Sequence, residues 1–264
     1  MIINKEVAYK FNNSEMLGSV LDNTCTDIVC ENVTEIRPYA LYSCNSIVSI
    51  NCPQCVNINI GAFSKCSSLT DINFPKCTQI GSYAFKDCIS LIRADFPTCT
   101  KIRPSAFMNC NSLTDANFPA CTNMGNYAFL NCSSLIRANF PVCTNIAWEA
   151  FGNCSSLTSI NFSEVITINA YAFNRCINLS EVNFPMCTTI SDYAFYNCNN
   201  LVNLRLEGNS VCTLVHSNAF SSTPIGGYSD IAGQYGSIYV PSVLLTSYQT
   251  ASNWSYFASR FVGF

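Results

Sequence analysis

The chain has 264 residues, of which 49% are apolar and only 11% are charged. No uninterrupted apolar run approaches the roughly 18 residues that a membrane-spanning helix needs, so we expect the apolar side chains to line a core. The formal net charge of −3 gives no electrostatic reason to expect nucleic acid or an anionic membrane as a partner.

The N-terminal segment does not follow the pattern of the rest of the chain. It mixes Asn, Ser and Lys with scattered Val, Tyr, Phe and Leu, and it contains no 7–15-residue apolar stretch typical of a signal peptide. Open solenoid ends need covers, so we expect residues 1–25 to form an N-terminal cap.

Beyond this segment the chain repeats itself every 22 residues. A fixed period in this range is the signature of a solenoid, in which each copy forms one coil and cannot bury its apolar face alone. We therefore expect one elongated solenoid over residues 26–221. The period is marked by Phe63, Phe85, Phe107, Phe129, Phe151, Phe173 and Phe195, by Cys66, Cys88, Cys110, Cys132, Cys154, Cys176 and Cys198, and by Leu69, Leu91, Leu113, Leu135, Leu157, Leu179 and Leu201.

Each copy predicts a short strand followed by a return leg. The strand over residues 69–74 should stack on its neighbours in one parallel sheet, at about 4.8 Å per coil. Pro75 ends it, because proline donates no hydrogen bond to the ladder. On the opposite side, Ala84 and Phe85 are expected to form a short helical turn with the ring in the interior.

The composition changes after residue 221. Residues 238–240 read as a last strand, and Pro241 suits the start of a helix. Trp254, Tyr256, Phe257 and Phe261 supply an apolar cluster. We expect residues 222–264 to form the C-terminal cap.

The repeat Ile-Gly-x-x-Ala-Phe-x-x-Cys-x-Ser-Leu-x-x-x-x-Phe-Pro resembles the BspA-like leucine-rich repeats found in anaerobic, gut-type bacteria. The C-terminal segment from Ile238 to Trp254 is similar to the terminal cap of such proteins. The resemblance implies a right-handed leucine-rich repeat solenoid that mixes strands with short helical turns. It further implies a surface-associated or secreted binding protein, in some cases an adhesin. It does not imply an enzyme, and we expect none.

Polar columns run along the exposed face of the predicted sheet. Successive strand residues point to opposite faces, so the second, third and fifth positions of each strand should face solvent. Opposite charges on neighbouring strands stabilise the stack by about 0.2–1 kcal/mol per pair, and amides can link from coil to coil. Two interpretations remain open. The columns either have a structural role, in which they keep successive coils aligned, or they bind a protein or glycan, possibly host-derived. The candidate partner-binding residues are Asp71, Asn73, Ile92, Arg93, Asp95, Asp115, Asn117, Ile136, Arg137 and Asn139.

The 18 cysteines fall mostly at two positions of the repeat, so their number reflects the copy count. Zinc needs clustered ligands, and only Cys52 and Cys55 show a Cys-x2-Cys spacing, so we expect no metal or other cofactor. We favour buried, reduced thiols that pack as small apolar groups. Stacked neighbours nevertheless approach the 4.4–6.8 Å Cα separation of a disulfide, which leaves bridging geometrically open.

The resulting hypothesis is a non-catalytic binding or adhesion module that uses the sheet face. One alternative is a structural component of a larger surface assembly. Another is a carbohydrate-active enzyme, because Asp71, Asp95 and Asp115 share the face at separations near those of paired glycosidase carboxylates. Arg93 between Asp71 and Asp115 argues against the enzyme, since it would keep both acids ionised. A catalytic triad would need His216, the single histidine, whose sequence neighbours mark no such site.

Overall fold

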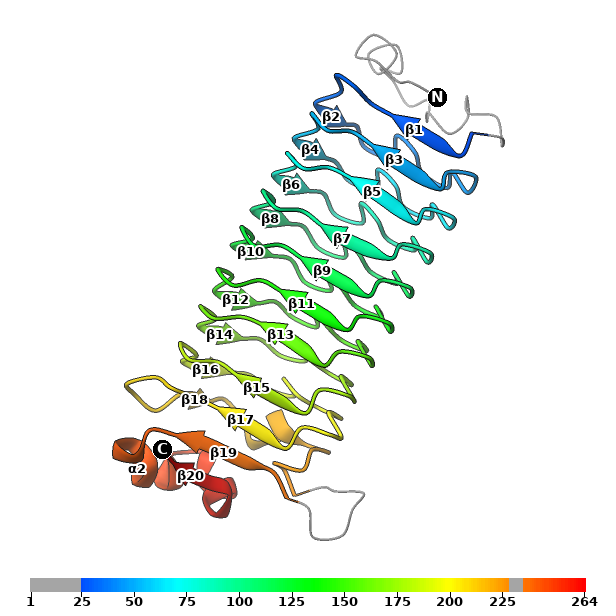
Figure 1. Cartoon of the computed structure of the whole chain (residues 1–264). Helices are drawn as coiled ribbons and strands as arrows, with labels where there is room; N and C mark the ends of the chain where they lie inside the picture. Colours follow the sequence, from blue (N-terminus) through cyan, green and yellow to red (C-terminus); the bar gives the residue numbers. More distant parts are fainter. Residues whose placement is uncertain (1–24, 228–234) are drawn as a thin grey trace.

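The computed structural model describes residues 25–227 and 235–264. The expected N-terminal cap lies outside these residues, apart from Cys25. The predicted solenoid of stacked 22-residue coils is confirmed (Figure 1). Where strands of consecutive 22-residue coils pair, residues 22 apart in sequence are direct neighbours, as with Arg137 and Asp115.

Each coil contributes a three-residue strand to a parallel arrangement that we call the first ladder. Its strands form three separate groups, and strands pair only within a group: the first runs from β1 to β5, the second from β7 to β13, and the third starts at β15. They are β1 (Asp27–Val29), β3 (Ser49–Asn51), β5 (Asp71–Asn73), β7 (Arg93–Asp95), β9 (Asp115–Asn117), β11 (Arg137–Asn139), β13 (Ser159–Asn161), β15 (Glu181–Asn183) and β17 (Asn203–Arg205).

The structure adds a second parallel ladder to the one sheet expected from the sequence. After the proline turn, each chain segment becomes extended again for two residues, with the isoleucine column pointing inward. The strands are β2 (Glu35–Ile36), β4 (Asn57–Ile58), β6 (Gln79–Ile80), β8 (Lys101–Ile102), β10 (Asn123–Met124), β12 (Asn145–Ile146), β14 (Thr167–Ile168), β16 (Thr189–Ile190) and β18 (Thr213–Leu214).

The Ala-Phe segment forms turns and not the helical turn expected from the sequence. Tyr83 and Asp87 have φ values of 59° and 61°, so the backbone enters the left-handed region twice per coil. Its amides therefore bond alternately within a turn, as from Lys86 N to Tyr83 O at 3.1 Å, and to the next coil, as from Phe85 N to Ala106 O at 2.8 Å. Only the last copy is helical, as the 3-10 helix η2 (Ser217–Phe220).

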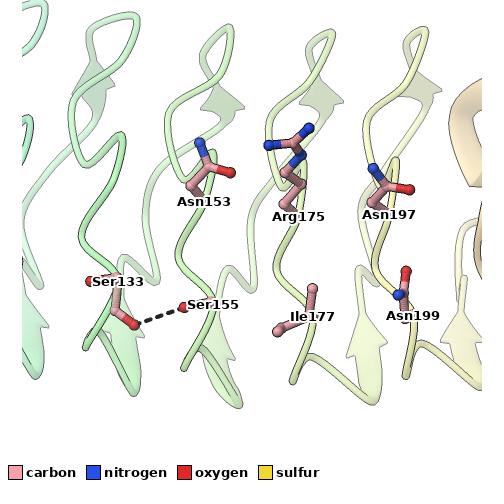
Figure 2. Close-up of a pocket in the computed structure, with 7 residues that line it drawn as sticks. All are labelled: Ser133, Asn153, Ser155, Arg175, Ile177, Asn197 and Asn199. Atoms are coloured by element: carbon pink, nitrogen blue, oxygen red, sulfur yellow. Dashed lines mark hydrogen bonds between the residues drawn. The ribbon is translucent and has the colours of Figure 1, made fainter.

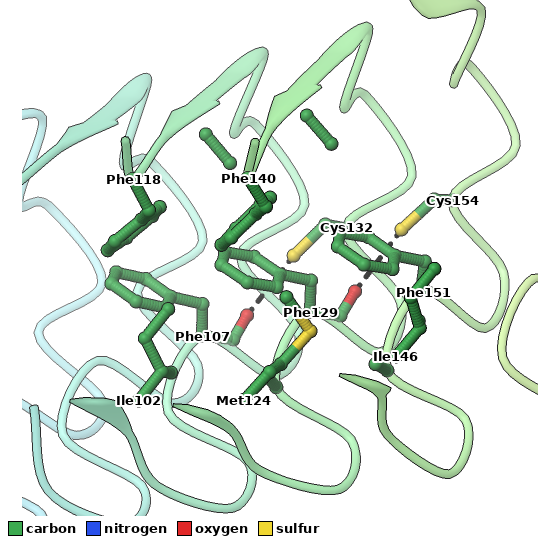
Figure 3. Close-up of a cluster of buried hydrophobic side chains, with 14 of the residues drawn as sticks. Ile102, Phe107, Phe118, Met124, Phe129, Cys132, Phe140, Ile146, Phe151 and Cys154 are labelled. Atoms are coloured by element: carbon green, nitrogen blue, oxygen red, sulfur yellow. Dashed lines mark hydrogen bonds between the residues drawn. The ribbon is translucent and has the colours of Figure 1, made fainter. Parts of the chain in front are cut away.

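The core contains two stacks of phenylalanine rings that run along the solenoid, together with columns of leucine, isoleucine, alanine and cysteine (Figure 3). Within one stack, the centroids of Phe107 and Phe129 lie 5.1 Å apart with an interplanar angle of 2°. Between the stacks, Phe107 and Phe118 meet edge to face at 5.7 Å. Aromatic pairs prefer these offset and edge-to-face geometries, so each added coil extends the same packing.

Both cysteine columns are buried, and all 17 cysteines from Cys30 onward plus Cys25 are free thiols. From Cys66 onward, those that precede the strand donate to the carbonyl of a neighbouring coil, as from Cys132 Sγ to Phe107 O at 3.2 Å. The open alternative of bridging is not realised. Burial raises the pKa of the Cys99 thiol to about 12, which keeps it protonated.

The C-terminal segment closes the end of the last coil. It comprises β19 (Ser237–Val240), η3 (Ser242–Leu244), α2 (Leu245–Thr250), η4 (Trp254–Arg260) and β20 (Phe261–Gly263), with β19 and β20 continuing the first ladder. Tyr248, Trp254 and Phe257 are buried, whereas Tyr256, expected in the same cluster, is 76% exposed. The reason is its place on the outer side of η4. The boundaries 222–264 of the cap stay a prediction.

Candidate functional site

The charged column on the exposed side of the first ladder is only partly paired. Asp115 accepts from Arg137, with Nη2 and Oδ2 2.9 Å apart, and lies 4.0 Å from the guanidinium of Arg93. Asp71 bonds instead to the hydroxyl of its own neighbour Thr70 at 2.8 Å, and among the described residues it forms no ion pair with Arg93. The two arginine side chains remain 66% and 61% exposed, so these pairs contribute at most about 1 kcal/mol and leave both guanidinium groups accessible.

The asparagine column forms a ladder of amide hydrogen bonds, as the sequence indicates. Asn139 donates to Asn117 at 2.7 Å, and Asn117 donates to Asp95 at 2.8 Å. The ladder stops between Asn73 and Asp95, where no side-chain bond joins the two coils. It stops again between Asn161 and Asn183, since Asn183 donates to Glu207 instead.

The backbone ladder is interrupted at the same two places. β5 does not pair with β7, and β13 does not pair with β15. Elsewhere the residue after the strand donates to the next coil, as from Phe96 N to Asn117 O at 3.0 Å, but the corresponding amides of Phe74 and Phe162 form no such bond among the described residues. The strands therefore part at these two coil boundaries.

Each parting opens a cleft on the exposed face. The β5–β7 cleft has a volume of about 250 Å³ and is lined by Thr70, Asp71, Ile72, Ile92, Arg93 and Asp95. The β13–β15 cleft, about 450 Å³, includes Ile160, Glu181, Asn183, Arg205 and Tyr239. Ile72 and Ile160 are half-buried, whereas the inward-facing residues on either side, such as Ala94 and Ile50, are buried. Each cleft thus combines an apolar floor with a charged rim, to which the β13–β15 cleft adds asparagine amides.

The candidate residues from the sequence all lie on this one face. Asp71, Ile92, Arg93 and Asp95 line the β5–β7 cleft, and Asn73 ends β5 beside it. The rest lie on β9 and β11 and in the residue before β11: Asp115, Asn117, Ile136, Arg137 and Asn139. Ile92 and Ile136 are 45% and 41% exposed, and their role as apolar contacts stays a prediction.

Sequence reasoning missed the β13–β15 cleft. Its Glu181, Asn183 and Arg205 belong to the same columns, so the repeat alone locates them on the face. Tyr239 could not be assigned, because it joins the column only through the pairing of β19 with β17. No periodic signal marks that register.

Metal ligands, the single histidine and membrane-spanning helices were the other features that the sequence brought into question. Within the described ranges, no three His, Cys, Asp or Glu side chains gather as metal ligands. His216 precedes η2, where its Nδ1 accepts from Asn218 N at 3.1 Å, so its ring has a helix-capping role. In the part of the chain that the structure describes, no helix is long and apolar enough to span a bilayer.

These features define a repeat solenoid whose first ladder presents an open face with two clefts. The chain belongs to the family described as the BspA type leucine rich repeat region, which it matches in six copies over residues 34–158 and 122–229. The expected right-handed leucine-rich repeat solenoid is therefore confirmed. No curated protein matches the chain.

Several solved structures are similar to this chain. A leucine-rich repeat protein from Bacteroides ovatus is 19% identical, with 91% of this chain and 84% of that one covered and a TM-score of 0.40. The T. pallidum leucine rich repeat protein is 24% identical, with 85% and 82% covered and a TM-score of 0.40. A leucine rich cell surface protein from Faecalibacterium prausnitzii is 19% identical, with 98% and 86% covered and a TM-score of 0.33.

Proposed function

We propose that this protein is a non-catalytic adhesion-type module that binds a segment of a partner protein on the exposed side of the first ladder. The observation that supports this most directly is the pair of clefts, which interrupt an otherwise continuous face. Exposed faces of repeat scaffolds are where such proteins bind. The coarser role, a protein-interaction module, agrees with the family.

The chemistry of the β5–β7 cleft suits a peptide better than a sugar. Ile72 and Ile92 offer an apolar surface for one aliphatic side chain, while Asp71 and Arg93 present opposite charges at its rim. Buried apolar anchors surrounded by polar rims carry most of the energy in protein interfaces. A protein segment with an aliphatic residue flanked by charged residues is the matching ligand.

The distance between the clefts extends the same argument. Ile72 and Ile160 are 88 residues, or four coils, apart, which corresponds to about 19 Å along the ladder. An extended segment of about six residues covers that length. Two anchors on one segment raise the effective concentration of the second contact, so moderate individual contacts give useful affinity.

Site-specific crosslinking tests this proposal. A photoreactive residue at Ile92 or Ile136 is expected to crosslink a protein partner, whereas one at the exposed Val215, outside the face, is not. The captured partner should bind the Arg93→Ala/Arg137→Ala variant about tenfold more weakly or worse. The matched control is Arg103→Ala, because Arg103 is exposed and lies outside the first ladder. This variant should bind the partner normally.

The outcomes separate the candidate functions. Equal crosslinking from residues 92 and 215, or normal binding by the double arginine variant, would contradict recognition by this face. If the face captured a glycan and no protein, the ligand would be a glycan and not the protein segment proposed here. Crosslinks only between copies of this chain or through its ends would favour the structural role in a larger assembly.

A further inference from the structure

A groove of about 540 Å³ lies at the corner of the coils, away from the exposed side of the first ladder. Figure 2 shows the lining side chains in two rows that cross consecutive coils. One row holds Asn153, Arg175 and Asn197, and the other holds Ser133, Ser155, Ile177 and Asn199. Among the described residues that line the groove, none carries a carboxylate.

Arg175 interrupts a second amide ladder. Asn109 donates to Asp87, Asn131 to Asn109, and Asn153 to Asn131, at 2.7–2.8 Å. The next position of this column is Arg175, which cannot accept from a neighbour as an asparagine does. Among the described residues the guanidinium has no carboxylate or carbonyl partner, and the amide oxygen of Asn153 receives no bond from it.

The backbone at this position favours asparagine. Asn153, Arg175 and Asn197 have φ values of 58° to 59°, in the left-handed region where asparagine is several-fold enriched and arginine is not. Lys65 is the comparable exception in the column, with φ 65°, but its Nζ lies over the ring of Tyr42 at 5.5 Å. Arg175 has no such internal use. An arginine held in a backbone conformation that disfavours it, with no bond inside the protein for its guanidinium, is where we look for a ligand.

We propose that this groove binds a linear oligosaccharide that carries carboxylates, with Arg175 as the carboxylate-binding residue. An unpaired guanidinium recognises a carboxylate through two parallel hydrogen bonds. The serine hydroxyls and the asparagine amides on either side supply donors and acceptors for sugar hydroxyls. Ile177, 41% exposed, provides an apolar surface for the C–H face of a ring.

The repeat spacing favours a glycan over an acidic peptide. Equivalent side chains recur about every 4.8 Å along the solenoid, close to the advance of one pyranose ring in a linear glycan. A chain of sugars thus meets the same pair of polar positions once per coil. An acidic peptide would instead need apolar pockets for its other side chains, and Ile177 is the only apolar residue in the lining.

The test uses tetragalacturonic acid as the probe, with binding measured by titration calorimetry on the whole chain. Arg175→Asn removes the charge and places at this position the residue found at 109, 131, 153 and 197, so the variant should fold. We expect its affinity for the probe to fall about tenfold or more. Lys65→Asn makes the same change at the same repeat position in another coil, and should bind the probe as the unaltered chain does.

Further arms decide the ligand class. The methyl ester of the same oligomer, which lacks the charge, should bind the unaltered chain no better than the acid binds Arg175→Asn. Arg93→Ala/Arg137→Ala should bind the acid normally, which separates this groove from the exposed face of the first ladder. No binding of the acid at millimolar concentration, equal losses in Arg175→Asn and Lys65→Asn, or tighter binding of a tetraglutamate peptide would overturn the proposal.

Discussion

At the scale of single residues, the cysteines show how the repeat uses polar side chains as core. Each thiol is small enough for the narrow corners of a coil, and most of them donate to a backbone carbonyl, as from Cys121 Sγ to Asn123 O at 3.6 Å. Burial raises the pKa of most of these thiols, to about 11 for Cys44 and about 12 for Cys55 and Cys99. Cys187 differs, because a hydrogen bond from Cys212, with the sulfurs 3.9 Å apart, lowers its pKa.

These raised pKa values predict a steep loss of stability in alkali. Above pH 9 the unfolded chain releases thiol protons that the folded chain retains, so the free energy of unfolding falls as the pH rises toward about 12. Each such thiol lowers the free energy of unfolding by about 1.4 kcal/mol per pH unit. Five of them lower it by about 7 kcal/mol over one pH unit, which is comparable with the stability of a whole domain. We expect cooperative unfolding near pH 10, followed by far-UV circular dichroism.

A single substitution checks the origin of this effect. Cys99→Ala deletes one thiol with little change in packing volume, so its unfolding free energy should fall less steeply above pH 9, by about 1.4 kcal/mol per pH unit. Stability that stays constant between pH 9 and pH 11 would contradict the assignment. A loss that begins only above pH 10 would indicate tyrosine ionisation instead, as at Tyr248, whose pKa burial raises to about 12.

At the scale of elements, the turn ladder combines backbone strain with amide bonding. Asn131 has a φ of 63°, donates to Asn109 and accepts from Asn153. Asparagine tolerates this conformation better than other side chains because its short amide bonds locally. The same residue thus satisfies the turn and links three coils.

Two substitutions at Asn131 separate these contributions. Asn131→Gly keeps the left-handed backbone but loses both amide bonds, which should cost about 1–3 kcal/mol. Asn131→Val loses the bonds and also adds about 1–2 kcal/mol of left-handed strain. Urea denaturation should therefore rank the unaltered chain above the glycine variant and the glycine variant above the valine variant. Equal stabilities of the two variants would mean that the turn relaxes without strain.

The same elements show what the sequence could and could not predict. The phase of the repeat located Phe107 and Cys132 in the core and Arg93 and Asn117 on the exposed face, because burial repeats with the period. The clefts were not predictable. Thr70 and Thr114 occupy equivalent positions in the repeat, yet β5, which follows Thr70, does not pair with the next strand of the ladder, whereas β9, which follows Thr114, does. Strand pairing depends on small differences in coil-to-coil packing, which residue type alone does not encode.

Arg175 marks the same limit in the candidate groove. The sequence shows an arginine in a column of asparagines. Whether that arginine is available to a ligand depends on whether another group of the protein neutralises or contacts its charge. Lys65, in the same column, contacts an aromatic ring, and Arg175 contacts nothing comparable. Only coordinates distinguish these two cases.

At the scale of the whole molecule, the C-terminal segment completes the last coil through polar as well as apolar contacts. Trp254 Nε1 donates to Cys212 O at 2.6 Å, and the hydroxyl of Tyr248 accepts from Cys212 N at 2.9 Å. Asn253 donates to the carbonyls of Leu214 and Val215, both at 2.9 Å. Side chains thereby bond to backbone groups in and beside β18 that a further coil would otherwise bond.

Deletion of residues 241–264 should therefore convert the solenoid end into an adhesive edge. The deletion exposes the ring of Phe220, which now contacts Trp254 and Phe257, and frees the backbone groups around Cys212. Unpaired strand edges and stacked apolar rings associate with one another, so we expect dimers or larger aggregates in light scattering at micromolar concentration. Tyr256→Ser, which alters an exposed residue of the same segment, should remain as associated as the unaltered chain. A truncated chain with the mass and melting temperature of the unaltered protein would show that the last coil needs no cover, and that the contacts of Tyr248, Asn253 and Trp254 serve another purpose.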